Sequence, residues 1–293
     1  MDGVLNVNKP SGMTSHDVVA KVRKLIKERR IGHTGTLDPL ATGVLVLCVG
    51  KATRIAQYIE AGEKEYVAVM HLGTTTDTLD AEGRVLETKA YDAPDIGQVR
   101  EAIQQFIGPI MQQPPAYSAI KVNGIPSYKL AREGKAEPLK PRPVTIHEIE
   151  LLEYADPVIR IRVRCSKGVY IRTLCADIGA ALGMGAHLTA LERTRSGLFG
   201  IEGSVTLDAV AAMAEDGSME QFLLPIDKAL SDLPAVSVTE AETGRILNGN
   251  QVNRDASLLD AGSGLARIHD PFGRLLALGR VTAGMLRPEM VFS

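Results

Sequence analysis

The sequence predicts a mixed α+β protein with a small β-rich module at its C-terminal end. In residues 1–232, short apolar or alternating runs typical of strands take turns with amphipathic stretches of helical spacing. From about Leu233 the pattern changes to short apolar patches, separated by the turn at residues 248–250 and by several glycines. We therefore expect a body of residues 1–232 and a second domain of residues 233–293.

The first predicted elements are a strand, a turn and a helix. Residues 3–8 alternate apolar and polar side chains as a strand does, and residues 9–12 contain the Pro and Gly of a turn. Thr14 and Asp17 have the spacing of a capping box. The apolar residues that follow, through Ile26, fall on one face of a helix.

The alternation of elements continues through the middle of the chain. Strands are predicted at residues 44–49, 66–72, 158–165 and 186–194, and helices at residues 53–61, 96–107 and 207–213. Residues 169–172 are expected to be extended and to lead into an amphipathic helix that ends near residue 182. The polar residues 73–83 predict a loop, and residues 111–145, rich in Pro, Gly and Lys, predict an extended surface segment.

Composition places the chain among ordinary globular proteins, with 45% hydrophobic and 23% charged residues. No run approaches the ~18 apolar residues of a membrane helix, and residues 1–6 lack the features of a secretory signal. The three cysteines, Cys48, Cys165 and Cys175, are scattered and lack C-x-x-C spacing. We therefore expect a cytoplasmic protein without membrane attachment, disulfides or a cysteine-bound metal.

The net charge of −2 conceals a separation of charge along the chain. Residues 1–35 contain seven Lys or Arg against three Asp or Glu, and residues 121–142 contain six against two. Residues 160–172 carry only basic charges, whereas residues 202–260 contain eleven acidic and three basic side chains. The pattern favours a protein that binds a particular polyanion, although ordinary solvated faces would give the same counts.

One carboxylate stands out in this sequence. Asp38 lies in the stretch GHTGTLDPLATG, residues 32–43, directly before the apolar run at residues 44–49. Pro39 disfavours helical geometry at Asp38, and the glycines of the stretch permit backbone shapes closed to other residues. Asp38 therefore either caps a turn or is presented for chemistry.

The spacing of the motifs excludes several cofactor-dependent chemistries. Gly50 and Lys51 are not a phosphate-binding loop, because Gly43 lies seven residues before Gly50 and Ala52 replaces the required Ser or Thr. Neither G-x-G-x-x-G nor G-x-S-x-G is present. The six histidines are well separated and include no H-x-x-x-H pair. If Asp38 is catalytic, we expect it to act without a metal or cofactor.

Five separated blocks of sequence agree with one known family. They are Asn8-Lys9-Pro10-x-Gly12-x-Thr14-Ser15, Gly32-His33-Thr34-Gly35-x-Leu37-Asp38-Pro39-x-Ala41-x-Gly43, Lys64-x-Tyr66, Gly168-x-Tyr170-Ile171-Arg172, and Leu191-x-Arg193-Thr194 with Ser196-Gly197. In this order and at these separations, they resemble the bacterial tRNA pseudouridine-55 synthases, the TruB family, over about residues 3–230. Residues 233–293 resemble a PUA-type RNA-binding module more loosely.

The resemblance implies a pseudouridine-synthase fold, with a mixed or antiparallel sheet flanked by helices, and isomerisation of uridine 55 in the tRNA T-loop. The N-glycosidic bond of a flipped-out uridine breaks, the uracil rotates and a C–C bond forms, without a cofactor or metal. The catalytic aspartate of the family corresponds to Asp38. A glycosidase uses two carboxylates, but here the uracil stays bound, so one ionised carboxylate suffices. Whether Asp38 attacks the base, attacks the ribose or abstracts a ribose proton stays open.

The resemblance also implies roles for residues around the substrate. Arg172 would keep Asp38 ionised, or else face a phosphate. Tyr66 would stack on the target base, or else belong to the core. Tyr170 is expected to line the same pocket, because residues 170 and 172 of an extended piece point to one face. Leu191 would form the pocket floor, or else pack in the core.

The expected partner is a folded tRNA T-stem-loop, because RNA-binding proteins read splayed loop bases and backbone shape. His33 resembles the family histidine that meets the displaced nucleotide of the T-loop. Lys9 and Lys64 would either support the fold or contact phosphate. The basic segment 117–142, which contains two tyrosines, is expected to become ordered on the RNA. We expect a monomer.

Two other functions compete with this interpretation. The first is a catalytically idle tRNA-binding or RNA-folding factor, and the joint presence of Asp38, Tyr66 and Arg172 counts against it. The second is a nucleoside or sugar hydrolase, which would need a second paired carboxylate. Asp77 and Asp80 are the only nearby candidates, and they are expected at the surface or close to the RNA.

Overall fold

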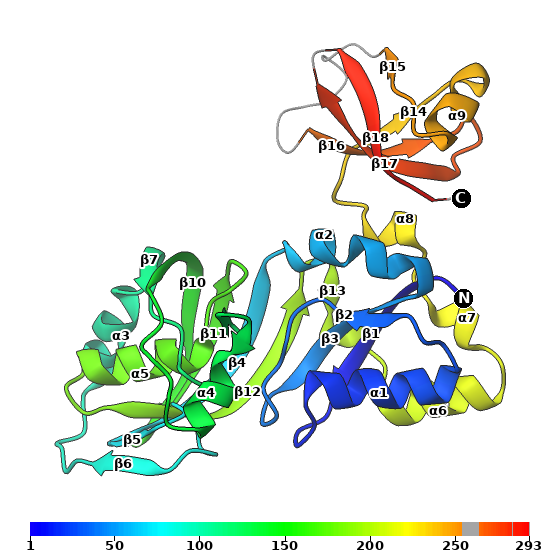
Figure 1. Ribbon diagram of the computed structural model, residues 1–293. Helices are drawn as coiled ribbons and strands as arrows, with labels where there is room; N and C mark the ends of the chain where they lie inside the picture. The colour runs from blue at the N-terminus through cyan, green and yellow to red at the C-terminus, as the bar shows by residue number, and fades with distance from the viewer. Residues whose placement is uncertain (254–263, 283, 293) are drawn as a thin grey trace.

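The computed structural model describes residues 1–253, 264–282 and 284–292. A long curved body built on one large sheet carries a small second sheet at its C-terminal end (Figure 1). This arrangement confirms the predicted α+β class with a β-rich C-terminal domain. Within the described residues, no helix is long and apolar enough to cross a membrane.

The large sheet has the strand order β1-β3-β12-β4-β11-β10-β7, with β2 paired to β3 and β13 paired to β12. Its strands are β1 (Gly3–Lys9), β2 (Ile31–His33), β3 (Thr42–Val49), β4 (Lys64–Leu72), β7 (Gly108–Gln112), β10 (Arg142–Ala155), β11 (Val158–Cys165), β12 (Ala186–Ser196) and β13 (Phe199–Gly200). The described pairings are antiparallel except for β12 with β3, where Arg193 lies opposite Gly43. This parallel junction lies next to the Asp38 loop, because that loop leads into β3.

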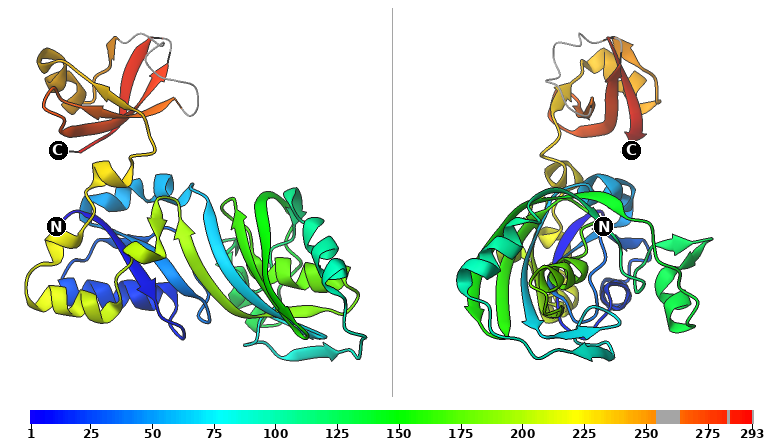
Figure 2. Two further views of the ribbon diagram at one scale, coloured as in Figure 1. Left: turned by 180° about the vertical axis from the view of Figure 1, so that it is seen from behind. Right: turned by 90° about the vertical axis from the view of Figure 1, so that its left-hand side faces the viewer.

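Helices cover the two ends of the sheet. Near the N-terminus these are α1 (Ser15–Ile26) and α6 (Leu207–Glu215), and at the other end α3 (Ile96–Gln104) and α5 (Ile171–Ala181) (Figure 1). Seen end-on, the sheet curls around α5 (Figure 2, right). The shorter helices are η1 (Gly50–Ile55), α2 (Ala56–Glu60), α4 (Ser127–Arg132), η2 (Ile201–Gly203), α7 (Met219–Phe222) and α8 (Ile226–Ala229).

Local sequence signals account for several of these elements. The capping box of α1 is confirmed: Thr14 Oγ1 accepts a hydrogen bond from Asp17 N at 3.1 Å, and Asp17 Oδ2 accepts one from Thr14 N at 2.9 Å. In β4, alternate residues from Lys64 to Leu72 are buried, as the period of a half-covered strand requires. The apolar run in β3 is buried along almost its whole length, because both faces of this strand are covered. Alternate residues from Val44 to Cys48 belong to one apolar cluster, and alternate residues from Leu45 to Val49 belong to another.

Three expectations are corrected. The predicted helix at residues 53–61 begins as the 3₁₀ helix η1 and only then becomes α2. The expected loop at residues 73–83 contains β5 (Thr74–Thr76), which pairs with β6 (Val85–Thr88). The expected extended segment at 111–145 instead includes the end of β7, the short pair β8 (Lys121–Val122) and β9 (Ile125–Pro126), the helix α4 and the start of β10. Bulges in β10 interrupt the alternation of buried and exposed side chains, so the sequence pattern does not reveal this strand of 14 residues.

The arginines of β11 do not form a free basic surface. Arg162 is paired with Glu150 of β10, and Arg164 Nε lies 3.4 Å from Glu148 Oε2. Arg160 lies opposite Glu153 in the register of the two strands. Cross-strand pairing of opposite charges stabilises this outer face of the sheet and neutralises most of its charge.

The C-terminal domain is a five-stranded sheet of order β14-β16-β17-β18-β15 with one helix. Its elements are β14 (Ala235–Ser237), α9 (Glu240–Leu247), β15 (Val252–Asn253), β16 (Leu265–His269), β17 (Leu275–Thr282) and β18 (Met285–Val291). It packs directly on the body: Leu265 and Leu278 share an apolar cluster with Val44 and Ile55. Arg54 Nη1 donates to Val291 O at 2.7 Å across the same contact.

Candidate active site

The Asp38 loop joins β2 to β3 and is held mainly through its backbone. Gly35 and Gly43 adopt φ values of 122° and 95°, which disfavour residues with a Cβ. Ser15 Oγ accepts from Leu37 N at 2.8 Å and donates to Leu37 O at 3.1 Å. Ala41 N donates to Asp38 O at 3.1 Å, which closes the turn around the aspartate. The Asp38 carboxylate therefore projects from a fixed loop and remains 32% exposed.

Lys9 lies fully buried beneath the loop. Its Nζ donates to Pro39 O at 3.2 Å, Met13 O at 2.6 Å and Pro10 O at 2.8 Å. Burial lowers the pKa of Lys9 to about 8, although the charge of Asp38 opposes this shift. Lys9 was expected either to support the fold or to contact phosphate, and these contacts show that it supports the fold.

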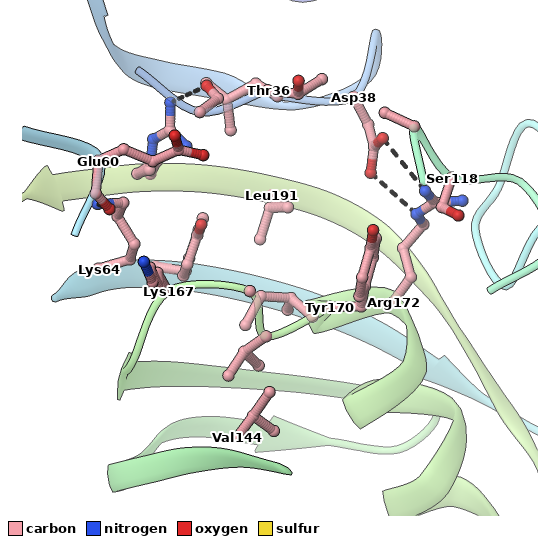
Figure 3. A pocket seen from close by; sticks show the side chains of 18 of the residues that line it. Thr36, Asp38, Glu60, Lys64, Ser118, Val144, Lys167, Tyr170, Arg172 and Leu191 are labelled. Atoms are coloured by element: carbon pink, nitrogen blue, oxygen red, sulfur yellow. Dashed lines mark hydrogen bonds and ion pairs between the residues drawn. The ribbon is translucent and has the colours of Figure 1, made fainter. Parts of the chain in front are cut away.

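Arg172, on the first turn of α5, forms an ion pair with Asp38. Its Nε lies 2.9 Å from Asp38 Oδ2, and its Nη2 donates to Asp38 Oδ1 at 3.2 Å (Figure 3). The guanidinium is itself fixed by carbonyl oxygens, since Nη1 donates to Thr78 O and Nη2 to Tyr117 O, both at 2.9 Å. Its side chain is only 5% exposed, so solvent screens the pair weakly.

Arg172 also contacts a second carboxylate, Asp80, on its other side. Arg172 Nη1 lies 3.4 Å from Asp80 Oδ2, and the Asp80 side chain is 5% exposed. Thr78 Oγ1 donates to Asp80 Oδ1 at 2.5 Å, and Glu82 N donates to the same oxygen at 3.1 Å. Asp80 was expected at the surface or close to the RNA, and the first of these alternatives is wrong: the loop after β5 folds inward and buries Asp80 against Arg172.

Opposing influences act on the ionisation of Asp38. Burial raises the pKa of its carboxyl group, and the negative charge of Asp80 adds to this effect. The Arg172 guanidinium, its hydrogen bond and the Lys9 ammonium favour the ionised form. The net direction is a raised pKa, so Asp38 is a poorly solvated carboxylate whose charge depends on neighbouring cations.

A cavity of about 510 Å³ opens beside Asp38. Six of the residues singled out from the sequence line it, namely Asp38, Lys64, Tyr66, Tyr170, Arg172 and Leu191. Asp38 and Arg172 lie toward one end of it, Lys64 and Lys167 toward the other, and Leu191 between them (Figure 3). Tyr66 and Leu191, at 8% and 7% exposure, present small apolar areas to this space.

Tyr170 reaches the cavity by a different geometry from the one expected. Residues 169–172 are not one extended piece, because α5 begins at Ile171 and Tyr170 is its N-cap. Gln112, buried at the end of β7, fixes this position: Tyr170 N donates to Gln112 Oε1 at 2.8 Å and Gln112 Nε2 donates to Tyr170 O at 3.0 Å. The Arg142 guanidinium lies 5.2 Å from the centre of the Tyr170 ring.

Lys64 is 4% exposed, although it lies at the cavity edge. Its Nζ donates to Gly62 O at 2.7 Å and to Glu60 O at 3.1 Å. Burial lowers the pKa of Lys64 to about 8. These bonds attach the end of α2 to the start of β4.

His33 lies apart from the first cavity, in a second one of about 710 Å³. The two cavities share the wall formed by Asp38, Arg172 and Ser118. His33 Nδ1 is buried without a hydrogen-bond partner, and burial, followed by the charge of Arg193, lowers the pKa of the imidazole. Tyr117, Tyr128 and Arg132 of segment 117–142 line this second cavity, so the segment borders the site.

Sequence reasoning missed three groups that organise the site. Asp80 was considered only as a second carboxylate for a hydrolase, Gln112 carries no motif, and Arg193 was quoted only as part of a block. All three are nearly fully buried polar side chains, which are uncommon unless they are hydrogen-bonded for a purpose. Among the described residues, no group of three or more His, Cys, Asp or Glu side chains is placed to hold a metal ion.

Three family models match successive parts of the chain. The TruB family pseudouridylate synthase (N terminal domain) matches residues 23–171. The tRNA pseudouridylate synthase B C-terminal domain matches residues 172–231, and Pseudouridine synthase II TruB, C-terminal, matches residues 234–292.

Individual proteins match along nearly the whole chain. A tRNA pseudouridine synthase B from Dechloromonas aromatica (strain RCB) is 46% identical over 290 residues, which cover 99% of this chain and 95% of that protein. The protein of the same name from Burkholderia mallei (strain NCTC 10247) is 44% identical over 292 residues, covering 99% and 96%.

Solved structures share the fold. A chain in an H/ACA ribonucleoprotein bound to a substrate RNA containing 2′-deoxyuridine superposes with a TM-score of 0.74 at 29% identity, covering 99% of this chain and 85% of that one. A chain in the archaeal box H/ACA Nop10–Cbf5 complex gives 0.75 at 28% identity, covering 99% and 86%.

Proposed function

The chain belongs to the TruB family of tRNA pseudouridine synthases, which are isomerases, and on that basis we propose that it converts uridine 55 of the tRNA T-loop to pseudouridine with Asp38 as its single catalytic carboxylate. The observation that carries the assignment of Asp38 is its ion pair with Arg172 at the wall of the 510 Å³ cavity. A carboxylate held ionised in a poorly solvated site is suited to nucleophilic or electrostatic work on a sugar or base.

In the proposed reaction the uracil never leaves the cavity. The N-glycosidic bond breaks, the base rotates in place, and a C–C bond to the same ribose carbon forms. Asp38 acts on the base or on the ribose carbon, or removes a ribose proton. Each of these roles needs the ionised carboxylate, which Arg172 and Lys9 support.

A base in a duplex or a stacked loop cannot reach a half-buried carboxylate at the wall of a cavity, so the uridine must flip out of the RNA. Tyr66 is proposed to stack on the flipped base, with Leu191 forming the floor of the pocket and Tyr170 lining it. The small exposed areas of Tyr66 and Leu191 support this arrangement, because each presents only a face to the cavity. Lys64, which bonds to backbone carbonyls, is proposed to shape the pocket wall.

The second cavity is proposed to hold RNA next to the target nucleotide. His33 lies there beside the Asp38 loop, with an imidazole that burial and Arg193 keep from gaining a proton readily. We propose that it contacts the displaced nucleotide and transfers no proton. Segment 117–142 borders this cavity with Tyr117, Tyr128 and Arg132, and is proposed to close on the RNA.

Residues 1–232 are proposed to form the catalytic domain and residues 233–293 a PUA-like RNA-binding domain. The protein is proposed to act as a monomer. The ion pair of Asp227 with Arg267, at 2.9 Å, supports a fixed junction between the two parts.

The test is to incubate the protein with an unmodified tRNA transcript, without added metal or nucleotide, and to map pseudouridine. We expect one modified uridine, in the T-loop. Asp38→Asn should keep tRNA affinity within about tenfold, or ~1.4 kcal/mol, because it preserves the shape of the side chain, yet give no product. Substantial product from Asp38→Asn would remove Asp38 from the mechanism, and modification outside the T-loop would contradict the proposed substrate site.

A further inference from the structure

Arg193 is a fully buried cation, and none of the proposed catalytic steps involves it. It lies in β12, is 2% exposed, and is among the largest fully buried side chains. Its hydrogen bonds go to backbone carbonyl oxygens: Nε donates to Val44 O at 2.7 Å and Nη2 donates to Gly35 O at 3.1 Å. A guanidinium stays charged even when buried, so a protein must provide acceptors for it.

These two acceptors stand at opposite ends of the Asp38 loop. Gly35 precedes Asp38 by three residues, and Val44 is the first apolar residue of β3 after the loop. One planar side chain therefore joins both ends of the loop to β12. The backbone adds to this contact, because a Cβ on Gly43 would lie 2.3 Å from Arg193 O, so β3 and β12 approach each other here as closely as glycine permits.

The same side chain also neighbours the proposed stacking residue. Arg193 lies directly opposite Tyr66 in the register of β12 and β4, and directly opposed residues project from the same face of a sheet. Both line the cavity. Burial raises the pKa of the Tyr66 hydroxyl, and the charge and hydrogen bond of Arg193 oppose that rise.

We propose that Arg193 is a positioning residue for the isomerisation: it fixes the Asp38 loop and the Tyr66 ring relative to each other, so that the carboxylate and the stacked base meet in the reactive geometry. This inference rests on the proposed function. Arg193 need not touch the reacting atoms, because its two carbonyl acceptors and Tyr66 transmit the effect. A misplacement of about 1 Å at a reacting centre costs roughly a hundredfold in rate.

The experiment compares Arg193→Gln and Arg193→Lys with the wild-type protein on an unmodified tRNA. It measures thermal unfolding, tRNA affinity and the single-turnover rate at saturating enzyme. Arg23→Gln is the matched control, because Arg23 Nη2 likewise donates to a strand carbonyl, Ile31 O, but lines neither cavity.

We expect Arg193→Gln to bind tRNA within about threefold of wild type and to react roughly a hundredfold more slowly, because a positioning residue acts on the rate. Arg193→Lys should regain part of that rate, since one ammonium can reach one of the two carbonyls but not both. Arg23→Gln should react within about threefold of wild type. In combination with Tyr66→Phe, the loss caused by Arg193→Gln should be smaller than in the wild-type background, because the two residues act together.

A folded Arg193 variant that reacts within about threefold of wild type would overturn the proposal. A variant that loses only tRNA affinity would also overturn it. So would rate losses of Arg193→Gln and Tyr66→Phe that add fully in the double variant. If Arg193→Gln does not fold, Arg193→Lys decides the matter by the same criteria. Wild-type protein in the same assay separates the two proposals, because a wild type that makes no pseudouridine contradicts the proposed function and this inference with it.

Discussion

Asp80→Asn is the substitution that tests most directly how the site controls Asp38. Asp80 lies on the far side of Arg172 from Asp38, with its Oδ2 3.4 Å from Arg172 Nη1. The two hydrogen bonds to Asp80 Oδ1, from Thr78 Oγ1 and Glu82 N, can both be accepted by the amide oxygen of an asparagine. The variant therefore removes one negative charge and keeps the shape of the loop.

The magnitude follows from the single contact that changes. A hydrogen bond or ion pair to a charged partner contributes about 1.5–3 kcal/mol. In Asp80→Asn the amide oxygen keeps the two hydrogen bonds, so the amide NH2 group takes the place of Oδ2 and cannot accept from Arg172 Nη1. The contact is therefore lost, which costs Arg172 about 1.5–3 kcal/mol of anchoring. Both side chains are 5% exposed, so solvent screens this contact weakly. If the lost anchoring is expressed in the transition state, the plateau rate falls by about tenfold to a hundredfold.

The pH dependence of the rate should change as well, and in a direction that favours the reaction at low pH. The charge of Asp80 is one of the causes that raise the pKa of Asp38, after burial. Removing it lowers the pKa of Asp38, so the carboxylate stays ionised to lower pH. The acid limb of the rate profile should therefore move to lower pH in Asp80→Asn even though the plateau falls. An effect on folding alone would lower the plateau without that shift.

The assay is the single-turnover rate of pseudouridine formation between about pH 5 and 9, the range in which such limbs report the essential acid and base. Asp77→Asn is the matched control, because Asp77 lies in the same loop and its side chain accepts a hydrogen bond from Arg84 N at 2.8 Å. It should leave the acid limb in place. An acid limb that stays fixed or moves to higher pH in Asp80→Asn would refute the reasoning.

Three further predictions concern residues around the loop. Gly43→Ala should lower the free energy of unfolding in urea by about 2–5 kcal/mol, because φ is 95° and a Cβ would meet Arg193 O at 2.3 Å. With a folded pKa of about 8 against 10.5, Lys64 binds fewer protons in the folded protein than unfolded, so stability rises with pH across that window. Lys64→Met should remove up to about 1.4 kcal/mol per pH unit of that slope in urea titrations at pH 8–10. Lys9, also with a pKa of about 8, should give an alkaline limb in the rate, and Lys9→Arg should move this limb to higher pH.

The fold was predictable where side-chain pattern and strand environment agree. The continuous apolar run of β3 matches a strand covered on both faces, and the alternation of β4 and β11 matches strands with one covered face. By contrast, β10 has bulges after Ile146 and Leu151, each of which shifts the alternation by one residue. A strand of this kind is defined by its pairing with β11 and β7, which no local window contains.

The residues of the site also differ in how far the sequence could predict them. Asp38 could be found from its own surroundings, since Pro39 and the nearby glycines mark an unusual loop. Its ion pair with Arg172 joins residues 134 positions apart, and the resemblance to the TruB family supplied it where spacing could not. Asp80 was noticed only as a possible second carboxylate, and its contact with Arg172 joins two distant parts of the chain, so only the packed fold shows it buried there.

Lys9 and Arg172 have different roles at the site, and together they favour the ionised form of the half-buried Asp38 carboxylate. Lys9 holds the Asp38 loop through backbone carbonyls, so its position does not depend on the ionisation of Asp38. Arg172 contacts the carboxylate itself and is held in turn by Asp80 and two carbonyls. Asp80 holds Arg172 in place, but its negative charge also raises the pKa of Asp38. The position of Arg172 is therefore fixed at the cost of a less stable charge on Asp38. That balance suits a carboxylate that must stay ionised and yet remain weakly enough stabilised to react with the substrate.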